Sequence, residues 1–227
     1  MIGMITLPNI VFLKMQPYQK DFIELAIAHK VLCFGDYTLK SGRRSPYFFN
    51  TGLFSDGASL ATLGHFYASA ITASGVDFDM LFGPAYKGIP LATSVAIALA
   101  GAFRRNVPFC FNRKEIKDHG EGGILFGASL AGKVLIVDDV ISAGTSVNDS
   151  VNIIRQAGAA AAGVAVAMDR QERGEGLLSA VQETEHRHHI KVISIVTLDN
   201  VIEYLEIFKD MKAHLDRIND YRRQYGV

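Results

Sequence analysis

Short runs of apolar residues alternate along the chain with longer segments in which apolar residues recur at helical spacing. We expect the apolar runs to form buried β-strands at 80–82, 107–111, 134–137, 163–168 and 192–196. The helical pattern covers about 88–103, 147–157 and, less clearly, 174–187. This alternation predicts an α/β fold in which a mostly parallel sheet is flanked by helices on both faces.

The residues before this sheet have a different pattern. We expect a helix over about 16–30, a hairpin with strands at 37–40 and 47–49, and a second helix over about 57–74. Together they are interpreted as a small N-terminal cap, about 15–75, over the edge of the core, about 76–227, within a single domain. The segment from about 200 to 225 is expected to be helical and structural.

Two adjacent carboxylates, Asp138 and Asp139, end the most apolar of the expected strands. A loop of small residues follows them, and Gly144 lets a phosphate approach its backbone. Free N–H groups at the start of the next helix make such a turn an anion site. Carboxylates would repel a phosphate, so we expect them to bind sugar hydroxyls or Mg²⁺. The pattern therefore favours a phosphorylated sugar as ligand; the alternative is a buried strand with acids at its exposed end, before an ordinary helix cap.

Cationic side chains follow three of the other expected strands. Lys87 follows the first expected strand, Arg113 and Lys114 follow the second, and Arg170 follows the fourth. In open α/β sheets, ligands bind outside the carboxyl ends of the strands. Each cation alone is typical of a solvated surface, but their shared position predicts one site.

The segment 112–133 has neither a helical nor a strand period. Long connections without regular structure in compact domains are usually functional lids or disordered segments. This one carries Arg113, Lys114, Lys117 and His119 among possible glycine hinges, and acidic residues balance its charge. A solvated mobile loop is the alternative, but beside a phosphate site we expect a mobile lid that brings cations to a polyphosphate.

Composition narrows the classes of protein. The 227 residues suffice for one α/β domain, and 23 basic and 23 acidic residues give no sign of a nucleic-acid or membrane partner. Cys33 and Cys110 are too few for a disulfide framework or a zinc site, which fits a cytoplasmic location. Residues 1–14 lack the basic region and cleavage site of a signal peptide; they are treated as an uncertain extension, with Met15 a candidate start.

Two further motifs are better explained by ordinary structure than by a binding site. Residues 127–133 have the spacing of a nucleotide P-loop, but Val134 replaces the Ser or Thr and the segment precedes a strand instead of following one. The cluster of His186, His188 and His189 is more typical of an exposed helix end than of a metal site.

The segment 134–146 resembles the phosphoribosyl-pyrophosphate (PRPP) signature of type I phosphoribosyltransferases. Residues 34–50, 82–88, 112–123 and 169–174 resemble the orotate phosphoribosyltransferases, and the similarity covers nearly all of 15–227. That family transfers the 5-phosphoribosyl group of PRPP to orotate, giving orotidine 5′-monophosphate and pyrophosphate in pyrimidine synthesis. The resemblance implies Mg²⁺ as cofactor, held mainly by PRPP near Asp138 or Asp139, with no direct protein ligand assigned.

The resemblance also implies the site residues. PRPP contacts are expected from Lys40, Tyr86, Lys87, Arg113, Lys114, Lys117, His119, Asp138, Asp139, Val140, Ile141, Ser142, Ala143, Gly144, Thr145 and Ser146. Orotate contacts are expected from Phe48, Phe49, Ser142 and Arg170, and catalytic roles from Lys117, His119 and Asp139. The family more usually has threonine at the position of Ser142, which keeps the hydroxyl. A homodimer is implied, with the lid over 113–123 completing the neighbouring subunit's site.

Two rival functions share the PRPP site. A purine phosphoribosyltransferase is disfavoured because Phe48, Phe49, the lid and Arg170 match the orotate pattern. A regulatory protein that binds PRPP without turnover would not need the lid cations Lys114, Lys117 and His119.

Overall fold

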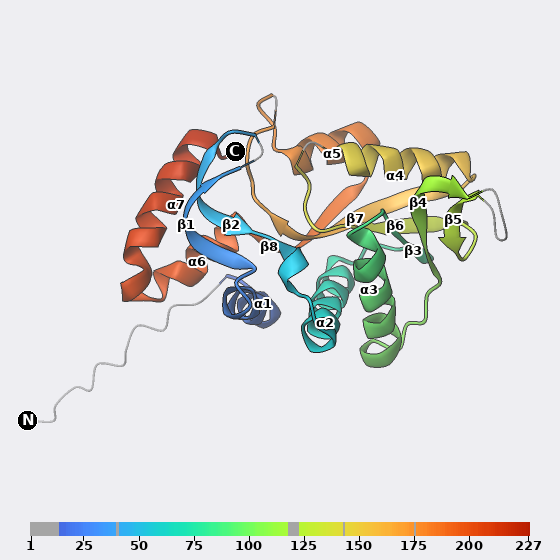
Figure 1. The fold of residues 1–227 in the computed structure, drawn as a ribbon, viewed down its shortest axis with the longest axis horizontal. Coiled ribbons are helices and arrows are strands. Elements are labelled where there is room, and N and C mark those ends of the chain that lie inside the picture. Colours follow the sequence, from blue (N-terminus) through green and yellow to red (C-terminus); the bar gives the residue numbers. More distant parts are fainter. Residues whose placement is uncertain (1–13, 40, 118–122, 143, 175) are drawn as a thin grey trace, which may run out of the picture.

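A computed structural model describes residues 14–39, 41–117, 123–142, 144–174 and 176–227, with the backbone alone at 115–117 and 123. A six-stranded sheet in the order β5-β4-β3-β6-β7-β8 forms its centre (Figure 1). The strands are β3 (Met80–Gly83), β4 (Phe109–Lys117), β5 (Gly123–Gly127), β6 (Lys133–Val137), β7 (Ala160–Asp169) and β8 (Lys191–Thr197). All neighbours pair in parallel except β4 and β5, which are antiparallel.

Helices cover both faces of this sheet. The helices α2 (Gly57–Ser74) and α3 (Gly88–Ala102) lie on one face, and α4 (Thr145–Gln156) and α5 (Ala180–His188) lie on the other (Figure 1). The residues of β6 explain why both faces are covered. Leu135 and Val137 belong to the core shared with α2 and α3, whereas Val134 and Ile136 belong to the core shared with α4. Successive side chains of a strand point to opposite faces, so a fully apolar strand requires a covered sheet. The predicted fold class is confirmed.

The remaining elements pack around the β8 end of the sheet. They are α1 (Pro17–Ala28), the antiparallel hairpin of β1 (Leu32–Thr38) and β2 (Arg44–Phe49), and the C-terminal helices α6 (Leu198–Glu206) and α7 (Lys212–Tyr225). Short 3₁₀ turns lie at Thr51–Leu53 and Lys209–Met211. The helix α1 contacts β8 and α6, and α7 contacts β2, so the C-terminal helix lies against the N-terminal hairpin.

Three predicted segments differ from the structure. The segment expected to lack regular structure contains the end of β4 and all of β5, because pairing between the two strands supplies the hydrogen bonds that no local period reveals. The helix expected over 174–187 begins only at Ala180, since Ser179 accepts a hydrogen bond from the N–H of Gln182 and caps it there. The C-terminal helical segment is divided into α6 and α7 by the turn at Lys209–Met211.

Among the described residues, no helix is long and apolar enough to cross a membrane.

Candidate active site

The carboxyl end of β6 brings the two predicted acids to one edge of the sheet. Asp138 and Asp139 follow Val137 directly and are only 7% and 8% exposed. Their carboxylates have different partners: that of Asp138 accepts a hydrogen bond from the Ser146 hydroxyl at 2.7 Å, and that of Asp139 binds Lys87. The two acids therefore face different parts of the site.

Asp139 lies where three elements meet. Its Oδ2 is 2.5 Å from Nζ of Lys87, which follows β3, and it accepts a 3.4 Å hydrogen bond from the hydroxyl of Thr51, in the turn after β2. The Lys87 side chain is 56% exposed and that of Asp139 is 12% exposed, so the pair borders open space. Thr51 was not predicted, and no sequence motif marks it.

Two glycines allow Lys87 to reach this position. A Cβ on Gly83 would lie 2.2 Å from the carbonyl oxygen of Gly88, and a Cβ on Gly88 would lie 2.9 Å from that of Val137. The end of β3, the start of α3 and the end of β6 therefore touch through their backbones. This contact places the Tyr86–Lys87 loop beside the acids.

The loop after Asp139 leads to a helix N-terminus. Gly144 has φ of +70° and is the N-cap of α4, a left-handed conformation that favours glycine. Ser142, Thr145 and Ser146 are exposed, and the first turn of α4 has no acidic side chain. Unpaired N–H groups, hydroxyls and the helix dipole give this end of α4 the features that favour binding of an anion. Ala143 lies outside the described residues.

Burial raises the pKa of the Asp138 carboxyl to about 6, although its hydrogen bond from Ser146 acts in the opposite direction. Two backbone contacts hold the residue: its carboxylate accepts from the N–H of Asp139 at 2.9 Å, and its carbonyl accepts from the Tyr67 hydroxyl at 2.7 Å. Ionised Asp138 is therefore maintained in the fold against a desolvation penalty, as expected for a side chain kept for binding.

We expect Asp138→Asn to stabilise the fold above about pH 6. The folded state binds the Asp138 proton more tightly than the unfolded chain, so wild-type stability falls as the pH rises from 4 through 6, by up to about 3 kcal/mol. Asparagine keeps the shape and does not ionise. In thermal melts from pH 4 to 8, the variant should nearly match the wild type at pH 4 and melt roughly 6–12 °C higher at pH 8. A difference that does not vary with pH would contradict this assignment.

The β4–β5 strands carry the predicted lid cations. Nζ of Lys114 lies 4.8 Å from the centre of the Tyr86 ring, and Cζ of Arg113 lies 5.4 Å from that of Phe126. Asn112, which was not predicted as a site residue, accepts a 2.8 Å hydrogen bond from the N–H of Ala85 and ties β4 to the loop after β3. Lys117 is the last residue of β4; its side chain, together with His119 and Lys40, lies outside the described residues.

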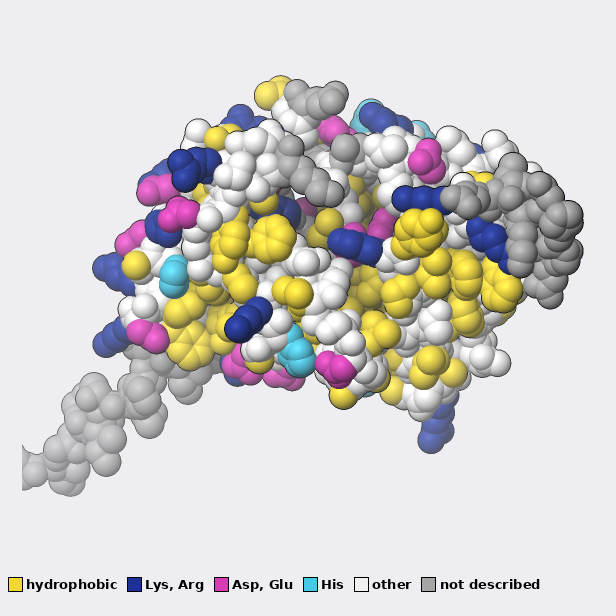
Figure 2. Space-filling model, in the orientation of Figure 1, with side chains coloured by type: hydrophobic (Ala, Val, Ile, Leu, Met, Phe, Trp, Pro, Cys, Tyr) yellow, Lys and Arg dark blue, Asp and Glu magenta, His cyan; other side chains and the backbone are white. Residues whose placement is uncertain are grey.

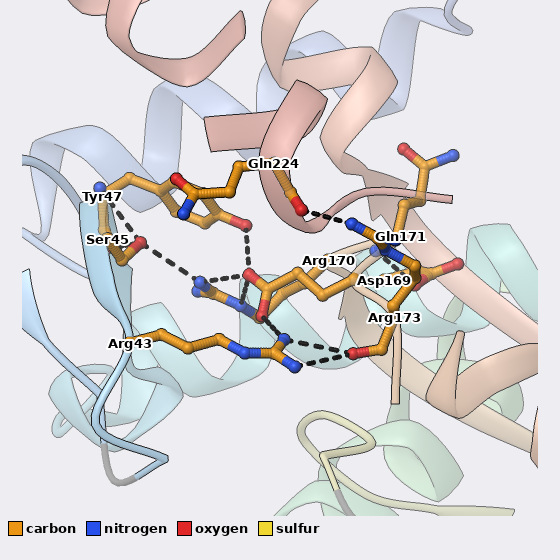
Figure 3. A network of polar contacts seen from close by, with 9 residues as sticks. Arg43, Ser45, Tyr47, Asp169, Arg170, Gln171, Arg173 and Gln224 are labelled. Carbon is orange, nitrogen blue, oxygen red and sulfur yellow. Dashed lines mark hydrogen bonds and ion pairs between the residues drawn. The ribbon is translucent and has the colours of Figure 1, made fainter. Parts of the chain in front are cut away.

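The other predicted residues lie on β2 and after β7. Phe48 is 37% exposed and stacks on Tyr37 with ring centres 5.4 Å apart, whereas Phe49 packs into the core beside Phe22. Strand alternation separates the two, so Phe48 is the one able to meet a ligand. Arg170 follows β7 and is held by Glu172, Ser45 and the ring of Tyr47, none of which was predicted (Figure 3).

The parallel sheet with its acidic strand end and its phosphate loop defines the class: a type I phosphoribosyltransferase. In agreement, the family model described as phosphoribosyl transferase domain matches residues 55–197. The orotate phosphoribosyltransferase of Cellvibrio japonicus is 60% identical over 213 residues, which are 94% of this chain and 99% of that protein. The one from Pseudomonas aeruginosa strain PAO1 is 59% identical, over 94% of this chain and all of that protein (100%).

A solved structure gives the same result. The crystal structure of orotate phosphoribosyltransferase from Francisella tularensis superposes with a TM-score of 0.84 at 42% identity, covering 91% of this chain and 100% of that one. The chain belongs to the orotate phosphoribosyltransferase family. The resemblance seen in the sequence is thereby confirmed.

Proposed function

We propose that this chain transfers the 5-phosphoribosyl group of PRPP to orotate, giving orotidine 5′-monophosphate and pyrophosphate in pyrimidine synthesis. Family membership supports the reaction. The observation that best supports this reaction is the arrangement at the carboxyl ends of β6 and β7. Buried Asp138 and Asp139, the loop before α4 and Arg170 all lie at this edge of the sheet. These groups suit the ribose hydroxyls, the 5′-phosphate and the carboxylate of the base, respectively.

In this reaction the bond between the anomeric carbon and the pyrophosphate oxygen breaks, and a bond to the ring nitrogen of orotate forms. Positive charge develops on the ribose and negative charge on the leaving pyrophosphate, so catalysis requires electrostatic stabilisation and no covalent nucleophile. Lys87, bound to Asp139 in this structure, is exposed enough to turn to the pyrophosphate. The lid residues Lys114, Lys117 and His119 are assigned to the same charge.

Mg²⁺ is assigned as the cofactor that arrives with PRPP. Among the described residues, no group of three or more His, Cys, Asp or Glu side chains is placed to hold a metal. Mg²⁺ is usually bound by one or two carboxylates together with substrate phosphates and water, and Asp138 or Asp139 fits that arrangement. When bound, it neutralises charge on the departing pyrophosphate.

The direct test follows orotate absorbance with purified protein, PRPP and Mg²⁺, with adenine, hypoxanthine and uracil as alternative bases. Consumption of orotate that requires both PRPP and Mg²⁺, with the other bases unchanged, is the expected result. Consumption of a purine base instead would establish the purine rival. Tight binding of PRPP without consumption of any base would establish a regulatory protein.

We also propose that the chain works as a homodimer. Hydrophobic side chains gather over the region of α3 and β3–β5 on the face shown in Figure 2. Ile97 of α3 is 68% exposed, and Ile124 and Phe126 of β5 are 40% and 43% exposed. Exposed apolar patches of this kind are typical of protein interfaces. Because they adjoin the lid strands, a second copy docked there would lie close to Lys114 and Lys117.

Hybrid dimers test whether the lid completes the neighbouring site. At an orotate concentration far below the raised KM of Arg170→Ala, each variant alone should be nearly inactive. Mixing Lys117→Ala and Arg170→Ala subunits should then restore roughly a quarter of wild-type activity, because random exchange makes half of the dimers hybrid and each hybrid has one intact site. The measurement is orotate turnover after the two variants are mixed and allowed to exchange. A mixture as inactive as its components, with exchange shown by mass-tagged subunits, would place the lid over its own subunit's site.

A further inference from the structure

Arg170 is anchored on one side of its guanidinium by a single carboxylate. Its Nε donates to Oε1 of Glu172 at 2.7 Å, and its Nη2 lies 2.6 Å from the same oxygen. Nη2 also donates to the Ser45 hydroxyl at 3.3 Å, and the guanidinium carbon lies 4.2 Å from the centre of the Tyr47 ring (Figure 3). Within the described residues these contacts use Nε and Nη2, and the Tyr221 hydroxyl also interacts with the guanidinium. We take Nη1 as the nitrogen that binds a ligand.

Glu172 is itself held by groups from the N-terminal hairpin. Its Oε1 accepts a 3.3 Å hydrogen bond from the Tyr47 hydroxyl, and its Oε2 lies 3.7 Å from Nη1 of Arg43. Arg43 also donates from both terminal nitrogens to the carbonyl oxygen of Arg173 at 3.1 Å. Glu172 therefore joins two segments that are more than a hundred residues apart in the sequence.

The backbone around Glu172 is fixed from the opposite side by the C-terminal segment. The N–H of Arg173 donates to the carbonyl of Tyr225 at 2.8 Å, and the N–H of Val227 donates to that of Gln171 at 3.1 Å. The Arg173 side chain donates to the carbonyl of Gln224 (Figure 3). The backbone at Glu172 is therefore held in place, so the position of Glu172 determines the orientation of the Arg170 guanidinium.

The three charged side chains that contact one another here, Arg43, Arg170 and Glu172, carry one positive charge in excess. Arg43 and Arg170 are cationic and Glu172 is anionic, and the side chains of Arg170 and Glu172 are only 16% and 14% exposed. One carboxylate on the substrate would neutralise the excess. Without Glu172 the cluster would be more positive, but Arg170 would lose its anchor.

We propose that Glu172 is a positioning residue for base recognition: it fixes Arg170 so that Nη1 meets the carboxylate of orotate, and so favours a base that carries a carboxylate over one that does not. This inference rests on the proposed function, in which Arg170 binds orotate. An arginine fixed before binding avoids the loss of side-chain freedom that a mobile arginine incurs on binding. Glu172 should therefore increase the affinity only for ligands that carry the carboxylate.

The test compares orotidine 5′-monophosphate with uridine 5′-monophosphate, which lacks only the carboxylate, by equilibrium binding. Glu172→Ala should weaken binding of orotidine 5′-monophosphate roughly tenfold and leave uridine 5′-monophosphate within about twofold. Glu172→Gln keeps the length and one acceptor for Nε of Arg170, so it should recover most of the loss, to within about threefold. If the alanine variant does not fold, Glu172→Gln carries the test: it should weaken binding of orotidine 5′-monophosphate about threefold and leave binding of uridine 5′-monophosphate unchanged. Glu24→Ala, in the exposed pair with Lys20 on α1, is the control and should change neither affinity.

Other outcomes overturn the proposal. Equal weakening for both nucleotides would show that Glu172 only maintains the fold, and unchanged or tighter binding of orotidine 5′-monophosphate would show that its charge, and not its anchoring, matters. Failure of the proposed function has a separate signature. In that case the wild type would not consume orotate with PRPP and would bind both nucleotides equally.

Discussion

Replacing Arg170 by alanine is expected to raise the KM for orotate about a hundredfold while leaving the KM for PRPP within about threefold. Removing one partner of a buried, hydrogen-bonded charge pair weakens binding by roughly 3 kcal/mol, which corresponds to about two orders of magnitude in affinity. PRPP is assigned to the opposite part of the site, around Asp139 and the loop before α4. Initial rates with each substrate varied in turn give both constants.

The loss of Arg170 also affects the fold, and the design must separate the two effects. Glu172 would lose its strongest ion pair and keep the weaker contacts with Arg43 at 3.7 Å and the Tyr47 hydroxyl at 3.3 Å, so stability should fall by about 2 kcal/mol. Arg170→Lys keeps the charge but not the planar fork, and should raise the orotate KM roughly tenfold. Arg155→Ala, at the exposed end of α4, is the matched control. Equal increases in both KM values would remove Arg170 from the base site.

The sequence predicts best those elements whose residues are fully buried and form one continuous apolar run. The run from Val134 to Val137 is fully buried between two layers of helices, so its apolar pattern has one structural explanation. The β4–β5 strands could not be predicted in the same way. Residues 112–117 are mostly polar and charged, and their extended form depends on pairing with 123–127, across a register shift.

The site shows the same division. Asp138, Gly144 and Ser146 belong to one continuous strand, loop and helix start, so their proximity follows from local geometry. Glu172 and Thr51 find their partners across long separations in the chain, and only the folded structure brings them together. No local pattern marks Glu172, because Gln171, between it and Arg170, has φ of +51° and the segment is not an extended strand.

Replacing Lys117 by alanine is expected to lower kcat by about a hundred- to a thousandfold, the usual effect of removing one group that stabilises charge in the transition state. The negative charge grows on the pyrophosphate as its bond to the ribose breaks, so the ammonium group contributes more to the transition state than to substrate binding. The KM for PRPP should therefore change much less than kcat. Steady-state rates at saturating orotate, with PRPP varied, separate the two constants.

The substitution of Lys117 should change the stability of the fold very little. Lys117 ends β4, the strand that pairs with the edge strand β5, and Lys114 nearby on β4 is exposed. The free energy of unfolding should stay within about 0.5 kcal/mol of the wild type. Lys212→Ala, at the exposed start of α7, is the control for loss of a lysine without loss of turnover. A large fall in melting temperature, with turnover per folded molecule unchanged, would assign Lys117 to the structure of the hairpin and leave the pyrophosphate to Lys87 and Lys114.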